Sequence, residues 1–189
     1  MVSDGELMQA YLDGDAAAFE ALYRRYDRRV YGFFFRALRD AALAEDLLQR
    51  TFLKLHRARA RYRRELAVGG WIFRIAYNLY RDELRRRGRH PEEELPDDER
   101  LGIAAHAADP WRDRARLVRA AVDGLPESQR EAILLCKYQE LTYEEAGAVT
   151  GVNPDAIKLR VFRALRSLRE RFRHEVGSHG ETPGPRQRT

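Results

Sequence analysis

The segment from residue 154 to residue 172 gathers side chains that could bind a nucleic acid. If it is helical, with a rotation of about 100° per residue, its basic and large apolar side chains form or flank one outward face. These side chains are Lys158, Leu159, Arg160, Phe162, Arg163 and Arg166. Guanidinium groups suit phosphate oxygens and guanine edges, so this face predicts contact with duplex DNA. A solvated basic helix end is the alternative, because Lys and Arg also favour helix C-termini.

The other face of this helix, and the residues before it, predict how the basic side chains are held. Its apolar positions predict a core-facing stripe, which consists of Ile157, Val161, Leu165, Leu168 and Phe172. Upstream, Thr142 can cap a short helix, and Glu145 can complete a capping box. Gly151 can end that helix at positive φ, and Asn153 can cap the next helix with Pro154 at its first position. Together these features predict a helix-turn-helix.

A second group of basic residues is interleaved with aromatic ones between residues 57 and 89. Arg61, Arg63 and Arg64 lie beside a tyrosine, and more arginines follow a segment rich in Trp and Tyr. This mixture suits single-stranded DNA, whose bases can stack on aromatic rings or sit in pockets. Packing in a helical core is the alternative for these aromatic side chains, above all for Trp71 and Phe73. The residues alone leave both interpretations open.

Apolar residues at three- to four-residue spacing predict four helices between about Asp4 and Arg87. Asp15 can cap the long second helix, the third covers about residues 43–59, and two glycines, 69 and 70, lead into the fourth. Four such helices can bury a core by themselves. The positions that we expect in that core are Phe19, Leu22, Tyr23, Tyr26, Val30, Phe33, Phe34, Leu47, Leu48, Phe52, Leu55, Trp71, Ile72, Ile75, Leu79 and Leu84.

The charge pattern divides the chain into parts. The formal net charge is +5, but residues 91–110 carry seven acids and a single arginine, together with three of the seven prolines. Two basic blocks therefore flank an acidic joint, which raises the expectation of a polyanionic partner. We predict an all-α protein with two helical domains, residues 1–89 and 111–174, joined by a flexible acidic linker, residues 90–110. Residues 175–189 are expected to form a disordered tail.

Other classes of function find little support in the sequence. The five histidines are scattered, Cys136 is the single cysteine, and no glycine-rich phosphate loop occurs. We therefore expect a protein that is not an enzyme and that needs no metal and no cofactor. No apolar stretch approaches the roughly 20 residues that a membrane-spanning helix needs. The acidic N-terminus lacks an apolar signal core, so a cytoplasmic location without membrane insertion is expected.

Five motifs in order resemble the extracytoplasmic-function (ECF) sigma factors, the compact members of the sigma-70 family of RNA polymerase subunits. They are GDAAAFEALYRRY, AEDLLQRTFLKLHRA, WIFRIAYNLYRDELRR, GLPESQREAILL and LTYEEAGAVTGVNPDAIKLRVFRA. The resemblance covers about residues 4–88 and 111–172. It implies that the first domain is sigma region 2, which opens and captures the minus-ten promoter element. The second domain is then region 4, whose helix-turn-helix reads the minus-thirty-five element.

The resemblance also implies partners. Both domains would bind core RNA polymerase, at the β′ clamp helices and the β flap, and the linker would thread toward the active cleft. In AEDLLQRTF, the matching positions that would meet the clamp helices are Asp46, Gln49 and Phe52. The loop from residue 61 to residue 70 matches the family loop that captures a flipped base. The side chains assigned to the minus-ten element are Arg61, Arg63, Arg64, Trp71, Arg74 and Asn78. An anti-sigma factor is a further implied partner.

Two departures from the family pattern concern promoter choice. Asp155 and Ala156 stand where Gly-Thr is usual, and Leu159 stands where Ser is common. An aliphatic group on a base favours a thymine methyl, and an acid repels a nearby phosphate. The promoter sequence therefore stays open. A stand-alone helix-turn-helix regulator is the alternative function, but such a protein has no need of the AEDLLQ surface.

Overall fold

The computed structural model describes residues 2–64, 67–89 and 110–178. These parts of the chain are helical and contain no strand, as predicted. Apart from Pro110, the predicted linker lies outside the described residues, and so does the predicted tail from residue 179 onward. The final helix continues to Ser178, so the predicted start of the tail at residue 175 is four residues too early.

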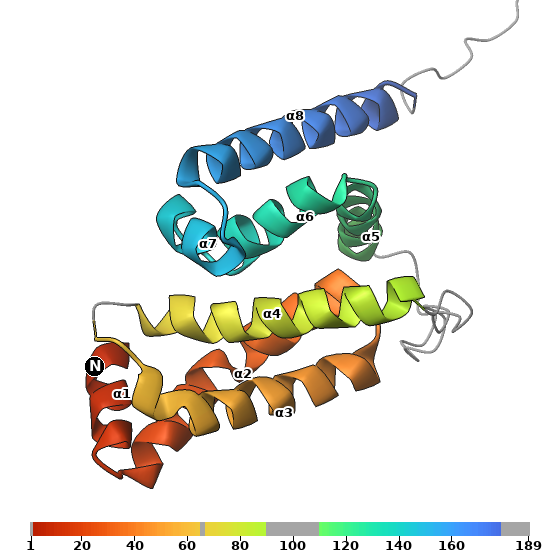
Figure 1. Cartoon of the computed structure of the whole chain (residues 1–189). Coiled ribbons are helices and arrows are strands. Elements are labelled where there is room, and N and C mark those ends of the chain that lie inside the picture. The colour runs from red at the N-terminus through yellow and green to blue at the C-terminus, as the bar shows by residue number, and fades with distance from the viewer. Residues whose placement is uncertain (1, 65–66, 90–109, 179–189) are drawn as a thin grey trace, which may run out of the picture.

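The N-terminal unit consists of α1 (Asp4–Leu12), α2 (Ala16–Leu38), α3 (Ala41–Ala58), the short 3-10 helix η1 (Arg59–Arg61) and α4 (Val68–Arg89) (Figure 1). The predicted cap is present, since the amide of Ala17 donates to Asp15 at 2.8 Å. Asp40 caps α3 in the same way, so this helix begins two residues before the predicted start. Gly69 and Gly70 lie inside the first turn of α4 and do not precede it, which corrects the predicted boundary.

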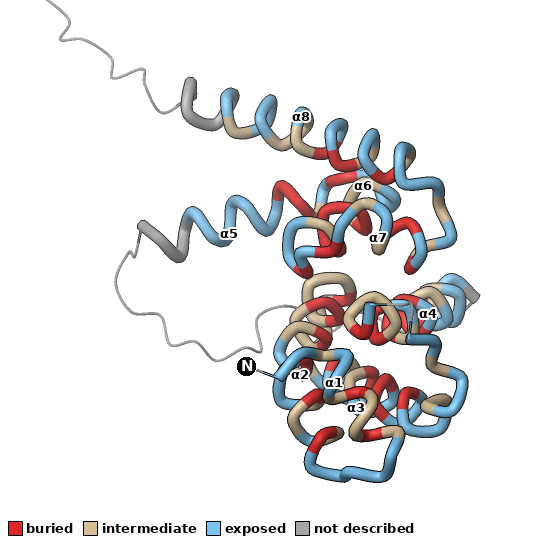
Figure 2. The backbone as a smooth tube through the Cα atoms, turned by 90° about the vertical axis from the view of Figure 1, so that its left-hand side faces the viewer, coloured by how far each residue is buried: buried red, intermediate tan, exposed pale blue. Residues whose placement is uncertain are grey.

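The core of this unit lies where α2, α3 and α4 face one another (Figure 2). Phe33, Phe73 and Tyr80 are fully buried, and the Phe33 ring meets the other two edge to face, with centroids 6.2 Å from Phe73 and 5.6 Å from Tyr80. Most of the predicted core positions are buried here, whereas Phe19 and Tyr23 are half-buried against the core. Burial of such aromatic side chains gives a large part of the hydrophobic stabilisation of a small helical unit.

The C-terminal unit consists of α5 (Pro110–Asp123), α6 (Glu127–Ile133), the π-helical turn η3 (Leu134–Tyr138), α7 (Tyr143–Thr150) and α8 (Pro154–Ser178). The predicted helix-turn-helix is confirmed in α7 and α8. Thr142 and Glu145 form the capping box, Gly151 ends α7 at φ 74°, and the amide of Asp155 donates to Asn153 at 2.8 Å. The π-helical turn was not predicted.

A close approach of two backbones fixes the turn between α7 and α8. Gly147 lies where α7 meets the chain that leads into α8, and a Cβ placed on it would stand 2.7 Å from the carbonyl oxygen of Val152. A separation below about 3 Å is too short for a carbon and an oxygen that are not bonded, so only glycine fits without movement. The sequence analysis assigned no role to this residue.

The two units lie against each other in the described structure, with α4 covered by α7 and α2 in contact with η3 (Figure 1). By contrast, α5 stands away from the body and contacts mainly α8 (Figure 2). The packing of one unit on the other was not predicted, because helix periodicity describes each helix and not its partner.

Candidate nucleic-acid interface

The basic face of α8 is held outward by a buried stripe. Ile157, Val161 and Ala164 are buried, and α8 packs on α6 and α7 through this side. The outer face carries exposed side chains, as predicted, and these are Lys158, Leu159, Phe162, Arg163 and Arg166. Arg166 is paired with Glu170 at 3.0 Å, in an exposed pair of low strength.

Two large apolar side chains stand in the middle of this basic face. Leu159 is 45% exposed and Phe162 is 62% exposed. Exposed apolar groups of this size on a single helix are typical of a surface that binds a partner. On a recognition helix they could contact thymine methyl groups, while Arg163 and Arg166 on the same face could contact phosphates or guanine edges.

Arg160 differs from the other five predicted residues of this face. It is half-buried and lines a hollow between the two units, opposite Asn78 and Arg81 of α4. The structure therefore separates it from the outward stripe, although the helical rotation placed it on the flank of that stripe.

The predicted minus-ten residues of α4 share one face, which is turned toward the C-terminal unit. Trp71 and Arg74 line a hollow together with Glu144 and Glu145 of α7. Asn78 is exposed and opens into the hollow that also holds Arg160. Residues spaced by three, four and seven lie on one side of a helix, so the spacing itself explains why the three α4 side chains coincide.

The basic turn before α4 places its arginines outside the core. Arg61, Arg63 and Arg64 are exposed, and the rings of Tyr62 and Trp71 lie 5.2 Å apart. Trp71 is half-buried, so it both packs against the core and presents part of its ring. Phe73 is fully buried, as the core interpretation predicted. Residues 65 and 66 of the predicted base-capturing loop lie outside the described part of the chain.

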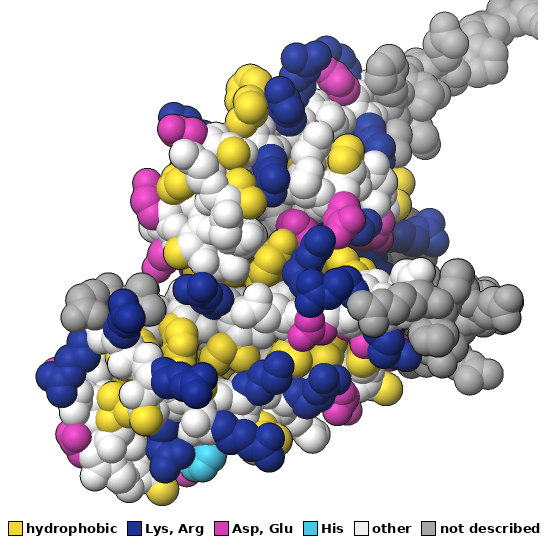
Figure 3. All heavy atoms as spheres, in the orientation of Figure 1, with side chains coloured by type: hydrophobic (Ala, Val, Ile, Leu, Met, Phe, Trp, Pro, Cys, Tyr) yellow, Lys and Arg dark blue, Asp and Glu magenta, His cyan; other side chains and the backbone are white. Residues whose placement is uncertain are grey.

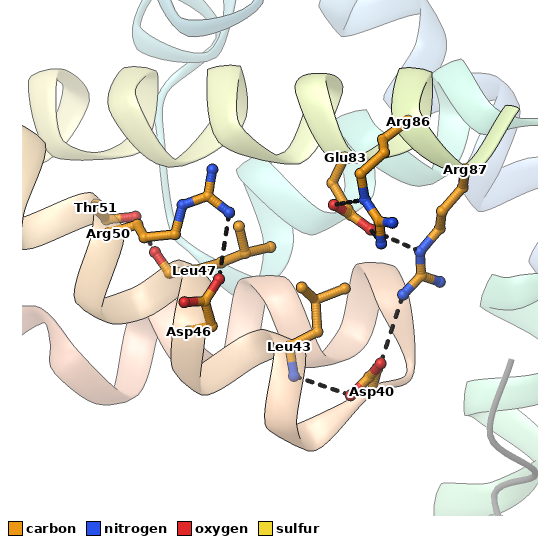
Figure 4. A network of polar contacts seen from close by, with 9 residues as sticks. All are labelled: Asp40, Leu43, Asp46, Leu47, Arg50, Thr51, Glu83, Arg86 and Arg87. Carbon is orange, nitrogen blue, oxygen red and sulfur yellow. Dashed lines mark hydrogen bonds and ion pairs between the residues drawn. The ribbon is translucent and has the colours of Figure 1, made fainter. Parts of the chain in front are cut away.

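The outer face of α3 carries the residues predicted to bind polymerase. Asp46 and Gln49 are exposed, and Asp46 accepts a hydrogen bond from Arg50 at 3.2 Å (Figure 4). On the inner side of the helix, the Thr51 hydroxyl donates to the Leu47 carbonyl at 2.7 Å. Lys and Arg side chains spread over the α3 and α4 side of the molecule (Figure 3).

Phe52 has a different environment from the one predicted for a polymerase contact. Its side chain is buried, and its ring centroid lies 4.6 Å from that of Tyr23 and 6.2 Å from that of Phe19. The structure therefore places Phe52 in the core. Leu53 is 48% exposed and shares the outer face with Asp46 and Gln49, because these residues follow one another at helical spacing. The sequence analysis missed Leu53, although an apolar residue on a polar stripe was a visible signal.

Polar contacts connect α4 to α6 at the boundary of the two units. The Tyr77 hydroxyl donates to Glu131 at 3.1 Å, and Arg81 pairs with Glu127 at 2.6 Å and with Glu131 at 3.2 Å. Basic and acidic side chains lie together along this boundary (Figure 3). Burial raises the pKa of Glu131, although Arg81 and Tyr77 act in the opposite direction. Burial also raises the pKa of Tyr80, to about 12.

Further contacts join α2 to the C-terminal unit. The Arg29 guanidinium donates to the Gln139 carbonyl and lies over the Phe73 ring at 5.4 Å. Arg39 pairs with Asp123 at 2.5 Å. Apart from Phe73, which was expected in the core, none of these residues was selected by the sequence analysis, because no local pattern marks a contact between segments so far apart in the chain.

Two general features complete the description of the surface. Within residues 2–64, 67–89 and 110–178, no three His, Cys, Asp or Glu side chains gather as metal ligands would. In the same described residues, no helix has the length and apolar character required to cross a bilayer.

Cys136 is half-buried, and burial raises the pKa of its thiol to about 11.

Comparison with known families and proteins assigns both units. Residues 22–90 match the family Sigma-70 region 2, and residues 115–168 match the family Sigma-70, region 4. The chain is 37% identical over 175 residues to the RNA polymerase sigma factor CarQ of Myxococcus xanthus, which covers 86% of this chain and 94% of that protein.

Two solved structures have a similar fold. The sigma factor RpoE, in a co-crystal with the anti-sigma factor NepR from Bartonella quintana, is 27% identical with a TM-score of 0.66, over 80% of this chain and 94% of that one. CnrH, in complex with the cytosolic domain of CnrY, is 22% identical with a TM-score of 0.70, over 90% of this chain and 97% of that one. The second likeness concerns the fold alone.

Proposed function

The chain belongs to the ECF sigma factors of the sigma-70 family, to which the 33% identical ECF sigma factor SigM of Mycobacterium tuberculosis also belongs, and we propose how its surfaces divide the work of starting transcription. As a sigma factor it associates with core RNA polymerase and directs it to promoters. We assign residues 1–89 to region 2, residues 111–174 to region 4 and residues 90–110 to the linker. It acts in the cytoplasm, where RNA polymerase is found, and has no catalytic activity of its own.

One observation carries the assignment of DNA contacts. The outward face of α8 combines the guanidinium of Arg163 with exposed Leu159 and Phe162, on a helix whose opposite side is buried in a helix-turn-helix. This is the geometry in which a recognition helix enters a major groove. The face of α8 therefore reads the minus-thirty-five element. The α4 face, with Trp71 and Asn78, receives the opened minus-ten strand.

Transcription in vitro tests this assignment directly. Purified chain is added to core RNA polymerase on a library of promoter fragments, and the transcripts are sequenced. We expect transcripts from a small set of fragments that share two elements, and none from core polymerase alone. Sequence-specific binding by the chain alone with nanomolar affinity, without any gain in transcription, would support a stand-alone regulator.

The polymerase surface is assigned to the outer face of α3. Asp46, Gln49 and Leu53 share that face, and an apolar side chain ringed by polar ones is typical of the centre of a protein interface. Phe52 then acts indirectly, since its ring supports α3 from the inside. Core binding is measured by titration with labelled chain.

We expect different results for the exposed Leu53 and for its buried neighbour Phe52. Asp46→Arg with Leu53→Ser should weaken core binding at least about tenfold, because a charge is reversed and an apolar contact is lost at one surface. Helical content and melting temperature should stay close to those of the parent. Phe52→Leu should instead lower the melting temperature with little change in the affinity of the folded protein. Unchanged affinity in the Asp46 and Leu53 variant would refute the surface.

We also propose that an anti-sigma factor restrains this chain. The support is the likeness to RpoE, which was solved together with the anti-sigma factor NepR. Co-purification from the native cell, followed by release of transcription when the captured protein is removed, would test this proposal. Capture of RNA polymerase subunits only would speak against it.

A further inference from the structure

We propose that the hollow between α2, α5 and η3 is a binding site for a nucleoside di- or triphosphate. The hollow has a volume of about 650 Å³, which lies in the range of small-molecule sites. The helix α5 projects from the C-terminal unit on the side of the molecule where α2 lies (Figure 2). None of the residues assigned above to DNA or polymerase lines this hollow, so the proposal does not depend on those assignments. It is called the arginine hollow below.

Positive charge gathers around the arginine hollow. Among the described residues that line it, none is acidic, although one of its arginines, Arg39, also pairs with Asp123. Guanidinium groups bind phosphate oxygens through two parallel hydrogen bonds, and a chain of phosphates concentrates several negative charges in a small volume. The charge of the hollow therefore fits a polyphosphate better than a single carboxylate. The arginines that line it are Arg28, Arg36, Arg39, Arg114 and Arg119.

Aromatic rings form part of the wall of the same hollow. Tyr31 and Phe35 lie at helical spacing on α2, and their ring planes differ by 5° with centroids 5.9 Å apart. Tyr138 of η3 lines the hollow as well, and the Arg36 guanidinium lies over its ring at 4.7 Å. A nucleobase stacks on such rings, and every base has a face that can do so. Groups for phosphate and groups for a base therefore share one hollow.

The side chain of Arg39 is placed at a local cost. It ends α2 with a φ of 58°, where glycine is the usual residue, because a side chain is strained in this conformation. Its Nε atom is buried and has no hydrogen-bond partner among the described residues. A buried donor without a partner costs free energy, and an oxygen of a bound phosphate would satisfy it. The position and the unmatched donor both point to a ligand with acceptor oxygens.

Gly32 makes room for a second arginine of the hollow. This glycine lies inside α2, where it lowers the stability of the helix relative to alanine. A Cβ placed on it would stand 2.5 Å from Nη1 of Arg36, so the absence of a side chain lets that guanidinium lie close to the helix. In this position the guanidinium faces the ring of Tyr138. The π-helical turn that carries the tyrosine is a form often found at functional sites.

The first experiment measures binding to the isolated full chain, because RNA polymerase itself uses nucleoside triphosphates. ATP, GTP, inorganic triphosphate and a single DNA strand of about 12 nucleotides are titrated separately in a calorimeter. We expect saturable binding of one ATP or GTP per chain, at least about fivefold tighter than inorganic triphosphate, because only the nucleotide adds base stacking. No saturable binding of either nucleotide up to about 1 mM would overturn the proposal.

A matched pair of double variants tests the charge of the hollow. Arg28→Gln with Arg119→Gln removes two charges that line it, whereas Arg24→Gln with Arg169→Gln removes two charges elsewhere. All four arginines are exposed, and each variant changes one on α2 and one in the C-terminal unit, so both should keep their helices by circular dichroism. The first variant should lose at least about tenfold in affinity for ATP and GTP, and the second less than about twofold. Equal losses would overturn the site, because net charge alone would then attract the nucleotide.

Two further variants test the base and the position of Arg36. Tyr31→Leu should weaken ATP and GTP binding at least about fivefold and leave inorganic triphosphate unchanged, whereas Tyr143→Leu, outside the hollow, should alter neither. Gly32→Ala should weaken nucleotide binding at least about threefold while the melting temperature stays the same or rises, which a merely structural role would not produce.

The contrary outcomes are distinct. If Tyr31→Leu leaves nucleotide binding unchanged, the hollow does not recognise a base and the proposed ligand class is wrong. If the single strand binds more tightly than ATP and GTP and loses affinity in the same variants, the surface belongs to a polynucleotide and the proposal fails.

Discussion

The two DNA-facing surfaces assigned to this sigma factor differ in what lies over them. The face of α8 points outward, and its large apolar residue Phe162 is 62% exposed. The corresponding face of α4 is turned inward, toward α6 and α7. Both helices are amphipathic and basic, so composition alone does not distinguish them. The difference arises from tertiary packing of one unit on the other.

This comparison bears on non-specific binding of duplex DNA. A basic surface binds any duplex through phosphate contacts, with an affinity that falls as salt rises. Arg74 and Asn78 of α4 remain exposed beside the C-terminal unit. The α4 face is therefore flanked by the other unit but not sealed, whereas the α8 face is open on its outer side.

The largest expected effect on the α8 face comes from a substitution in the turn between α7 and α8. In Gly147→Ala, the new Cβ would stand 2.7 Å from the Val152 carbonyl, so the backbone must shift. We expect the C-terminal unit to lose about 1–3 kcal/mol of stability, as in other overpacked sites. Every α8 contact with the minus-thirty-five element would be displaced together.

Footprinting of the holoenzyme on a promoter with a strong minus-thirty-five element measures this loss. Gly88→Ala is the control, because a Cβ at that position meets nothing within 4 Å. Protection of the upstream element should vanish in the first variant and persist in the second. Equal protection in the two variants would mean that the close approach is not required.

A smaller effect should separate the roles of the two faces. Arg163→Ala removes a base or phosphate contact worth about 1–3 kcal/mol, so initial binding weakens and a strong upstream element matters less. Asn78→Ala should leave initial binding nearly intact but impair strand opening, because the flipped base loses a hydrogen-bond partner. A premelted bubble template should therefore rescue transcription by the Asn78 variant and not by the Arg163 variant. Equal rescue of both would reject this division.

The sequence was sufficient to predict those features of the helix-turn-helix that depend on neighbouring residues. The capping box of Thr142 and Glu145 and the positive φ of Gly151 follow from local backbone chemistry, and all are present. Helical rotation also assigned most residues of α8 to the correct face, but Arg160 is half-buried between the units, and of the predicted buried stripe Leu165, Leu168 and Phe172 are only half-buried.

The sequence was insufficient where the outcome depends on contacts between distant segments. Helical periodicity placed Phe52 in the expected core while the family resemblance assigned it to polymerase, and the structure bears out the first, since Phe52 packs on Phe19 and Tyr23. The attachment of Glu131 to Tyr77 and Arg81 joins residues about 50 positions apart. A carboxylate directly before the apolar run of residues 132–135 was the available signal, since acids are rarely buried without a partner.

Two buried carboxylates extend the comparison to pH. Glu83 in the N-terminal unit and Glu131 at the boundary are each 5% exposed. Hydrogen bonds from Arg86, supported by Arg87, hold the pKa of Glu83 below its usual value (Figure 4). Burial raises the pKa of Glu131, because a single arginine and one tyrosine hydroxyl do not offset the loss of water. The shifts are opposite because desolvation is the largest cause for Glu131, whereas hydrogen bonds from guanidinium groups outweigh desolvation for Glu83.

The smallest expected effect follows from these opposite signs. For Glu83, the lowered pKa means that its stabilising contribution is present above its unfolded pKa, near 4.5, and is lost as pH falls through the lowered value. For Glu131, the raised pKa means that its contribution to the packing of the two units is most favourable below 4.5 and weakens as pH rises through the raised value. Arg81, Tyr77 and Glu127 face this carboxylate, and burial keeps the tyrosine neutral throughout by raising its pKa.

Carbon-13 spectra of the side-chain carboxylates, recorded as a function of pH, would show Glu131 titrating above the usual range and Glu83 below it. As pH falls toward 5, the melting temperature of the parent should rise relative to that of Glu131→Gln, because protonation of Glu131 favours the packed units and the amide does not titrate in this range. Glu83→Gln should leave this dependence on Glu131 intact while lowering the melting temperature at neutral pH. If Glu131 titrates in the ordinary range, or if the parent and the Glu131→Gln chain respond to pH equally, then the packing of the two units is not coupled to this carboxylate.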